Sequence, residues 1–334
     1  MSSQSLQNNF WNKLHKPFKV LAPMAGYTDS AFRLLCRELG ADVVVSELVS
    51  ADAIFHQSKY WYKDENNTWL SKRGKDETLE MLKFDEAERP YVIQLFGKFP
   101  DKFAFAAKWV SENLRPDGID INMGCPARKV VNSDHGAALL KNPELAVQIV
   151  KAVKENTDLP VSVKTRLGWD HDDQILEFAP QLLRAGISAL TIHGRTYKDA
   201  FKGAARWDNI YEVKKMFGDE LIVIGNGDIS SYEQLSTLAK DPFGETRLDG
   251  LMVGRAAFGK PWIFSKESMT NDELKMIILK QARYMLKIKG DFGMIEFRKH
   301  LVKYITGFVG AKDLRKKAVT VTSFEDVESL VSEL

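Results

Sequence analysis

Cys125 is the first residue in the sequence whose type and position suggest chemistry, because it lies in a Gly-Cys-Pro turn directly after an apolar segment. A buried cysteine usually packs as a small hydrophobic side chain, and Cys36 fits that description on the inner stripe of a predicted helix over 28–39. Cys125 is instead expected to donate a proton, as a thiol at neutral pH. The alternative is a nucleophile, which needs a neighbouring base, and only His193 or His135 could serve.

Two glycine-containing segments suggest a phosphate site. They follow consecutive apolar runs late in the chain and comprise Asn226, Gly227 and Asp228 in one case and Gly254 with Arg255 in the other. Glycine lets backbone N–H groups approach phosphate oxygens closely, and an arginine adds charge-assisted hydrogen bonds. The glycines could instead serve only to turn the chain. The occurrence of both segments together with an arginine favours phosphate.

Lys164 and His193 end two further apolar runs, at 160–164 and 188–193. A cation beside the N1–C2=O edge of a flavin stabilises the negative charge of the reduced ring. The alternatives are a surface lysine and a histidine satisfied within the core. Both side chains are expected to point over the mouth of whatever sheet these runs form.

The elements that must position these residues are eight short, β-branched runs separated by longer amphipathic stretches. Such nearly continuous apolar runs are typical of strands buried on both faces. Helices are predicted between them, for example over 28–39, 101–113 and 143–155, the last opening with an Asn142-Pro143 cap. The predicted fold is a (β/α)8 TIM barrel, whose functional residues follow the strands at the carboxyl-terminal rim. The eight runs are 19–22, 42–46, 91–95, 118–122, 160–164, 188–193, 221–225 and 249–253.

The barrel pattern ends near residue 264, and helical periodicity without strands follows. We therefore expect a catalytic barrel over 1–264 and a helical domain over 265–334. Residues 275–317 carry twelve Lys or Arg and three Asp or Glu, a net charge of +9 within a chain of net +2. A solvated helical face is the alternative, but this segregation favours RNA binding through cations such as Arg298 and Lys299.

Composition excludes several classes of protein. Two cysteines in 334 residues make no disulfide framework and indicate a reducing compartment, the cytoplasm. Residues 1–18 lack the apolar core of a signal peptide, and no run is long enough to span a membrane. None of the six histidines pairs with another His or a Cys at zinc-ligand spacing, so no metal is expected. We expect a monomer.

With these segments in view, the chain resembles the tRNA-dihydrouridine synthases over about residues 19–310. Among them it looks most similar to the bacterial group with a helical C-terminal domain. PMAG occurs in other flavin barrels, but the Asn-x-GCP turn combined with KxR and HGRT is specific to a much smaller group of proteins. The matching segments are LAPMAGYTDSAFR, DGIDINMGCPARKV, VSVKTRLGW, LTIHGRT, IGNGDI and LMVGRAAFGKPWIF.

The resemblance implies bound FMN, with NADPH or NADH as the electron donor and a uridine in tRNA as the substrate. Hydride would reach C6 of the uracil from the flavin, and Cys125 would protonate C5. Asn122 and Arg166 match residues near the uracil. The implied flavin contacts are Pro23, Met24 and Ala25 under the ring, Gln94, Lys164 and His193 at its polar edge, and Asn226, Gly227, Asp228, Gly254 and Arg255 at the phosphate.

One segment departs from the family pattern. A Gly-x-Gly-Ser or Ala-Gly-Ser run usually precedes Ala-Leu-Leu, whereas the stretch 132–140 keeps Gly136 but not the serine. Two rival functions are a flavin barrel acting on a small molecule, such as a dihydroorotate dehydrogenase or an ene-reductase, and a decayed barrel that only binds RNA. The first does not explain the basic helical segment, and the second predicts loss of Cys125, Lys164 or the glycines, all of which are present.

Overall fold

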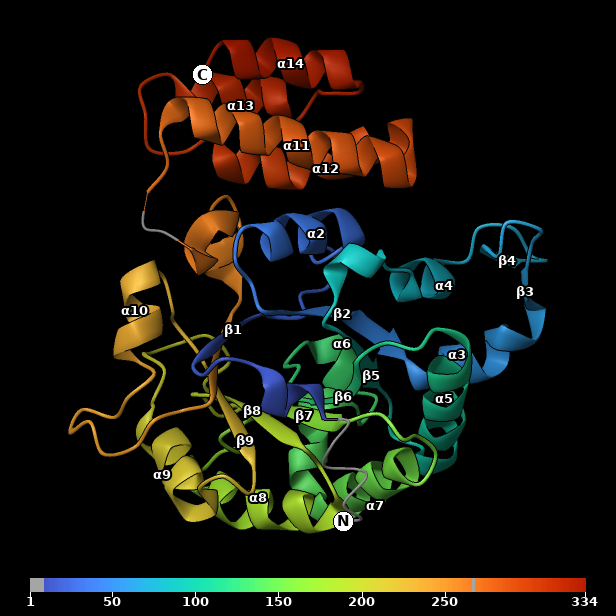
Figure 1. Cartoon of the computed structure of the whole chain (residues 1–334), viewed down its shortest axis with the longest axis vertical. Helices are drawn as coiled ribbons and strands as arrows, with labels where there is room; N and C mark the ends of the chain where they lie inside the picture. Colours follow the sequence, from blue (N-terminus) through green and yellow to red (C-terminus); the bar gives the residue numbers. More distant parts are fainter. Residues whose placement is uncertain (1–8, 266–267) are drawn as a thin grey trace.

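A computed structural model describes residues 9–265 and 268–334. Eight parallel strands close into a barrel in the order β1-β10-β9-β8-β7-β6-β5-β2, which confirms the predicted TIM barrel (Figure 1). All eight predicted runs are barrel strands, with ends shifted by a few residues at most. The strands are β1 (Phe18–Leu21), β2 (Val43–Ser50), β5 (Tyr91–Phe96), β6 (Gly118–Met123), β7 (Val161–Arg166), β8 (Ala189–His193), β9 (Ile222–Asn226) and β10 (Gly250–Val253).

The barrel helices pack around these strands. The helices predicted over 28–39, 101–113 and 143–155 are present. Asn142 caps α7 by accepting a hydrogen bond from the Leu145 amide, as the Asn-Pro pair predicted. The helices are α2 (Ser30–Glu38), α3 (Ala51–Gln57), α4 (Glu77–Leu82), α5 (Pro100–Asn113), α6 (Arg128–Val131), α7 (Pro143–Lys154), α8 (Gln174–Ala185), α9 (Asp208–Phe217) and α10 (Tyr232–Thr237).

The amino-terminal end of the barrel is plugged by aromatic side chains. Trp11, from the short helix η1 (Phe10–Lys13), packs against Phe18 at the start of β1 with ring centroids 5.6 Å apart. Both side chains are buried beside Val20, Val43 and other interior residues of the barrel. Because this end is filled, the opening of the barrel lies at the carboxyl-terminal ends of the strands, where the candidate residues are.

Four helices follow the barrel and form a bundle beside it, seen above α2 in Figure 1. They share one apolar core, which also takes in Ala31 and Leu35 of α2 and Trp262 from the end of the barrel. The predicted helical C-terminal region is therefore present, and α2 contributes to both parts of the molecule. No helix among the described residues is long and apolar enough to cross a membrane. The four are α11 (Asn271–Lys289), α12 (Asp291–Tyr304), α13 (Ala311–Ala318) and α14 (Phe324–Ser332).

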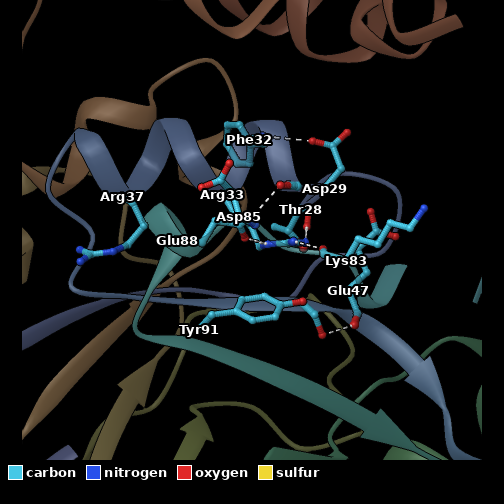
Figure 2. A network of polar contacts seen from close by, with 12 residues as sticks. Thr28, Asp29, Phe32, Arg33, Arg37, Glu47, Lys83, Asp85, Glu88 and Tyr91 are labelled. Carbon is cyan, nitrogen blue, oxygen red and sulfur yellow. Dashed lines mark hydrogen bonds and ion pairs between the residues drawn. The ribbon is translucent and has the colours of Figure 1, made fainter. Parts of the chain in front are cut away.

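A buried ion pair fixes α2 to the barrel (Figure 2). The Arg33 guanidinium donates to the Glu88 carboxylate, and also to the carbonyls of Thr28 at 2.7 Å and Lys83 at 2.9 Å. Its charge lies 4.8 Å from the centre of the Tyr91 ring. Since both charged side chains are fully buried, each depends on these partners for compensation. The network thus holds the helix on which the C-terminal bundle rests.

One element was not predicted. An antiparallel hairpin of β3 (Trp61–Lys63) and β4 (Trp69–Ser71) stands out from the barrel between α3 and α4 (Figure 1). Its strands are only three residues each. Trp61 and Trp69 both pack on Trp109 of α5, at centroid distances of 4.9 and 5.2 Å. The hairpin is held in place by this contact with α5.

Candidate active site

A cavity of about 680 Å³ opens at the carboxyl-terminal rim of the barrel. Its volume falls within the range of small-molecule and cofactor sites. Thirteen of the residues selected from sequence line it, although they come from six different strands and their following loops. They are Pro23, Met24, Ala25, Asn122, Cys125, Lys164, Arg166, His193, Asn226, Gly227, Asp228, Gly254 and Arg255.

Gln94 does not line the cavity but lies in a fully buried polar layer beneath it. Its Nε2 donates to Asp120 Oδ2 at 2.7 Å, and its Oε1 accepts from Asn122 Nδ2 at 2.8 Å. Ser162 Oγ donates to the second oxygen of Asp120 at 2.6 Å. Burial raises the pKa of Asp120 to about 6. The layer fixes the orientation of the Asn122 amide, so that its oxygen points toward the turn that follows β6.

That turn carries Cys125 and is held from two sides. Asn122 Oδ1 accepts hydrogen bonds from the backbone amides of Gly124 at 3.2 Å and Cys125 at 3.0 Å. From the other side, the Ala137 amide donates to the Cys125 carbonyl at 3.2 Å. Gly136 has a φ of +61°, and a Cβ placed there would lie 3.2 Å from the Cys125 Cβ. The glycine that survives in the divergent 132–140 segment is therefore the one that packs against the cysteine.

Lys164 reaches into the cavity from β7. Its Nζ donates to Asn226 Oδ1 at 3.0 Å, and Asn226 Nδ2 donates in turn to the Met252 carbonyl at 2.7 Å. Burial and the neighbouring Arg166 lower the pKa of Lys164 to about 8, against the opposing effect of Asp120. Near neutral pH the ammonium is retained at a cost, so it is poised to bind an anionic or strongly polar group.

His193 is neutral. Burial, reinforced by Lys164, Arg166 and Arg195, lowers its pKa to about 2. Its Nε2 faces Arg195 Nη1 at 3.3 Å and therefore accepts. The pKa of the other histidine considered as a base, His135, is also lowered by burial. His193 is therefore a poor base, and burial makes His135 a weaker base than a free histidine, which weighs against Cys125 as an activated nucleophile.

Arg166 is almost fully buried, with 2% of its surface exposed, and links two loops of the rim. Its Nε donates to the Gly124 carbonyl at 2.8 Å. Its Nη1 donates to the carbonyls of Thr196 at 3.0 Å and Ala200 at 2.9 Å. Burial lowers the pKa of Arg166 to about 10. The guanidinium thus ties the cysteine turn to the loop that follows β8.

Asp228 is neutralised by Arg195, a residue not selected as a site residue. Arg195 donates to the two carboxylate oxygens from Nη1 at 2.9 Å and Nη2 at 2.7 Å. Arg255 lies 3.7 Å from the same carboxylate, and 60% of its side chain is exposed. A Cβ at Gly227, where φ is +136°, would lie 2.6 Å from the Ala205 Cβ. This end of the cavity therefore combines an approachable backbone with a reachable cation, as an anion site requires.

Phe201 is a second residue that the sequence did not reveal. It lines the cavity while 54% of its surface remains exposed. Its ring lies 5.5 Å from the Arg166 guanidinium carbon and 4.8 Å from that of Arg255. An exposed aromatic ring between two cations at a pocket mouth can stack against a planar group. It lies in an irregular loop, where no periodicity marks it.

Arg298 and Lys299 lie outside the cavity, on α12. Arg298 Nε donates to the Val321 carbonyl at 2.6 Å, so its guanidinium is engaged within the bundle. Lys299 Nζ lies 5.8 Å from the centre of the Tyr27 ring, beside the loop that follows β1. Among residues 9–265 and 268–334, no three His, Cys, Asp or Glu side chains gather as metal ligands would.

Comparison with known proteins decides the family. A model described as dihydrouridine synthase matches residues 20–333. The chain belongs to the dihydrouridine synthase family. Among its relatives, tRNA-dihydrouridine synthase B of Pseudomonas syringae is 37% identical over 89% of this chain and 85% of its own length. A probable tRNA-dihydrouridine synthase of Aquifex aeolicus is 33% identical, covering 94% and 95%. A probable tRNA-dihydrouridine synthase 2 of Bacillus subtilis is 33% identical, covering 98% and 97%.

Dihydrouridine synthases are flavin-dependent oxidoreductases, and the residues of this one fit such a group. The cavity is large enough for a flavin, with a partly buried ammonium at Lys164 and an exposed cation at Arg255. Because the glycine backbone lies next to Arg255, a phosphate could be held there while a ring occupies the space beside Lys164.

Proposed function

We propose that this dihydrouridine synthase reduces the C5=C6 bond of a uridine in tRNA, with FMN in the rim cavity and NADPH or NADH as electron donor. The observation that carries the proposal is the position of Cys125. Its turn is fixed by Asn122 and Gly136, and it lines the same cavity as Lys164 and Arg255. On this proposal the acid and the flavin would share one opening, as reduction across a double bond requires.

The cofactor would be held along the length of the cavity. Pro23, Met24 and Ala25 would lie against the ring, and Lys164 and His193 would face its polar edge. Lys164 supplies a positive charge there, while neutral His193 supplies a hydrogen bond. Gly227, Gly254 and Arg255 would bind the phosphate, with Asp228 holding Arg255 and Arg195 in place.

FMN, when bound, supplies the hydride. The protein's own contribution is to orient the uracil and deliver a proton. Cys125 would protonate C5 from a turn that cannot swing freely. Asn122 is committed to that turn through its oxygen, and Arg166 through Nε, so both would act on the uracil largely by positioning the acid. Gln94, one layer lower, would support Asn122 rather than touch the ring.

The base must leave the folded RNA to reach this cavity, at a cost of about a few kcal/mol. Contacts with phosphates elsewhere can offset that cost. We assign these contacts to the helical region, with residues 1–264 as the catalytic domain and 265–334 as the tRNA-binding domain. Lys299 is partly exposed and lies beside the rim loop at Tyr27, which suits it for such a contact. A monomer acting in the cytoplasm completes the proposal.

The decisive experiment compares substrates on the purified, flavin-loaded enzyme. Reduction of unmodified tRNA, detected by mass spectrometry as a gain of two hydrogens on a uridine, is the expected result. Free pyrimidines should be turned over far more slowly. Comparable or faster turnover of a free pyrimidine would instead favour the small-molecule flavin barrel.

A further inference from the structure

The β3–β4 hairpin carries an unusual surface. Five cations lie along it and its flanks, all exposed, and none forms an ion pair within the described parts of the chain. They are Lys59, Lys63, Lys72, Arg73 and Lys75. Residues 59–75 contain only Asp64 and Glu65 as acidic residues, for a net charge of +3. The Asp64 carboxylate is occupied in closing the turn, where it accepts from the amides of Asn66 and Thr68.

Aromatic side chains lie among these cations. Tyr62 and Leu70 are directly paired across the two strands, on the face away from the barrel, with 40% and 36% of their surfaces exposed. On the opposite face, Trp61 and Trp69 pack on Trp109, and Lys63 lies over the Trp69 ring with its Nζ 5.3 Å from the ring centre. Single exposed apolar residues are ordinary. A paired tyrosine and leucine within a set of exposed cations instead resembles the surfaces that hold nucleic acid through phosphate contacts and base stacking.

The hairpin is rigidly placed rather than loosely attached. Trp61 Nε1 donates to Asp76 Oδ2 at 2.7 Å, which ties the first strand to the start of α4. Arg73 stacks on the Tyr60 ring at 3.5 Å and hydrogen-bonds to its hydroxyl. A preorganised surface loses little conformational entropy on binding, so its contacts contribute more to affinity.

The surface continues onto the C-terminal bundle. Lys75 Nζ lies 4.7 Å from the centre of the Phe292 ring, at the start of α12, and Figure 1 shows the α11–α12 turn above the same side of the molecule. Phe292, Lys299 and Lys303 are seven and four residues apart, so they share one face of α12. Lys299 in turn reaches the rim beside Tyr27. A line of cations and exposed rings therefore joins the hairpin to the mouth of the cavity.

We propose that the β3–β4 hairpin is a second RNA-binding arm, which grips the phosphate backbone of the substrate tRNA through its cations and stacks one exposed base on Tyr62. The proposal rests on tRNA being the substrate. It adds a contact from the barrel side to those of the helical region. Folded tRNA would then lie along the hairpin and the neighbouring α12 face, which leads to the mouth of the cavity.

A triple variant, Lys59→Gln with Lys63→Gln and Lys72→Gln, tests the arm on the flavin-loaded, full-length enzyme. Arg73 and its stacked Tyr60 stay intact, so the hairpin keeps its fold. The matched control is Lys151→Gln with Arg184→Gln and Lys215→Gln, which removes three exposed cations from the outer surface of α7, α8 and α9 (Figure 1). Affinity for unmodified tRNA is measured by filter binding at several salt concentrations.

The hairpin variant should bind tRNA roughly tenfold more weakly at low salt and lose about two to three from the salt slope, near 0.9 for each phosphate contact removed. The control should match the native enzyme, and kcat at saturating tRNA should be unchanged in both. Ultraviolet cross-linking should attach RNA to the peptide containing Tyr62, and Tyr62→Ala should abolish that adduct.

Equal tRNA affinity in the hairpin variant and its control would overturn the arm while leaving the proposed function standing. So would cross-linking of the Tyr62 peptide to a protein instead of RNA. If the native enzyme showed no salt-dependent binding of tRNA, both the arm and the proposed substrate would fall.

Discussion

Arg166 Nε lies 2.8 Å from the carbonyl oxygen of Gly124, the residue before Cys125. The same guanidinium binds two carbonyls of the loop after β8, so one buried side chain sets the position of the cysteine turn relative to that nearby loop of the rim. Neighbouring Asn122 holds the turn from below. The position of the cysteine is therefore fixed by a network of hydrogen bonds from β6, β7 and the loop after β8.

The first prediction concerns that hydrogen-bond network. Arg166→Lys keeps the positive charge but loses the planar guanidinium, which donates to several carbonyls at once. Buried carbonyls left without donors cost about 1–3 kcal/mol each. We expect kcat for tRNA reduction to fall by at least tenfold, with altered alkylation of Cys125 by iodoacetamide. Arg184→Lys, on the exposed face of α8, is the control and should change neither. An unchanged kcat in Arg166→Lys would refute the positioning role.

The second prediction tests the acid. Cys125→Ala should bind FMN with native affinity and be reduced by NADPH, yet lose about 10²–10⁴-fold in the rate of tRNA reduction, the usual contribution of a general acid. Single-turnover kinetics with prereduced enzyme measure that rate. Cys36→Ala is the matched control, because Cys36 is fully buried and its surroundings raise the pKa of its thiol. Normal turnover by Cys125→Ala would exclude the assignment.

The third prediction follows from the pKa of Lys164, which burial lowers to about 8. The ammonium form prevails below that pH and binds an electron-rich ring edge better. The affinity of the flavin-free protein for FMN should therefore be highest below pH 8 and decline as the pH rises through it. Lys164→Met should bind FMN about 10–100-fold more weakly and flatten this dependence, since a hydrogen bond to a charged group contributes about 1.5–3 kcal/mol. Fluorescence titration from pH 6 to pH 10 checks both, and an identical pH profile in the variant would contradict the assignment.

The fourth prediction concerns stability. Arg33→Met leaves the Glu88 carboxylate buried without its partner, which should lower the free energy of unfolding by about 3–5 kcal/mol. The double variant Arg33→Met with Glu88→Gln should recover part of that loss, because the uncompensated charge is gone. Urea unfolding followed by circular dichroism measures the difference. A double variant less stable than the single one would show that Glu88 is compensated by other groups.

The barrel could be predicted because its strands are buried on both faces. Burial on both faces requires continuous β-branched runs, such as Val43–Val45, and these are visible in the sequence. The hairpin could not. Its two short strands carry no periodicity to speak of, and its position depends on Trp61 and Trp69 meeting Trp109 of a later helix. That contact is tertiary, so no local pattern reports it.

The sequence also could not predict how deep in the barrel a side chain near a strand end would lie. Gln94 and Asn122 were both selected near strand ends, yet β5 runs on to Phe96 and leaves Gln94 a layer below the cavity. Nor could the sequence predict the direction in which each basic side chain of a helix points. Arg298 and Lys299 are adjacent in a basic run, but one donates to a backbone carbonyl of the bundle and the other faces the rim. Both residues contribute equally to the basic composition of the segment, and only their packing contacts show that their roles differ.

That separation gives the last prediction. Arg298→Gln removes the hydrogen bond from Nε to the Val321 carbonyl, so it should destabilise the bundle by about 1–3 kcal/mol, with tRNA affinity falling only as the fold loosens. Lys299→Gln should leave the unfolding midpoint unchanged and instead reduce the salt slope of tRNA binding by about one. Thermal unfolding and filter binding on both variants distinguish the two roles. If Lys299→Gln kept the full salt slope while Arg298→Gln lost it without destabilisation, Arg298 would be the phosphate contact and the helix face assigned to tRNA would be the wrong one.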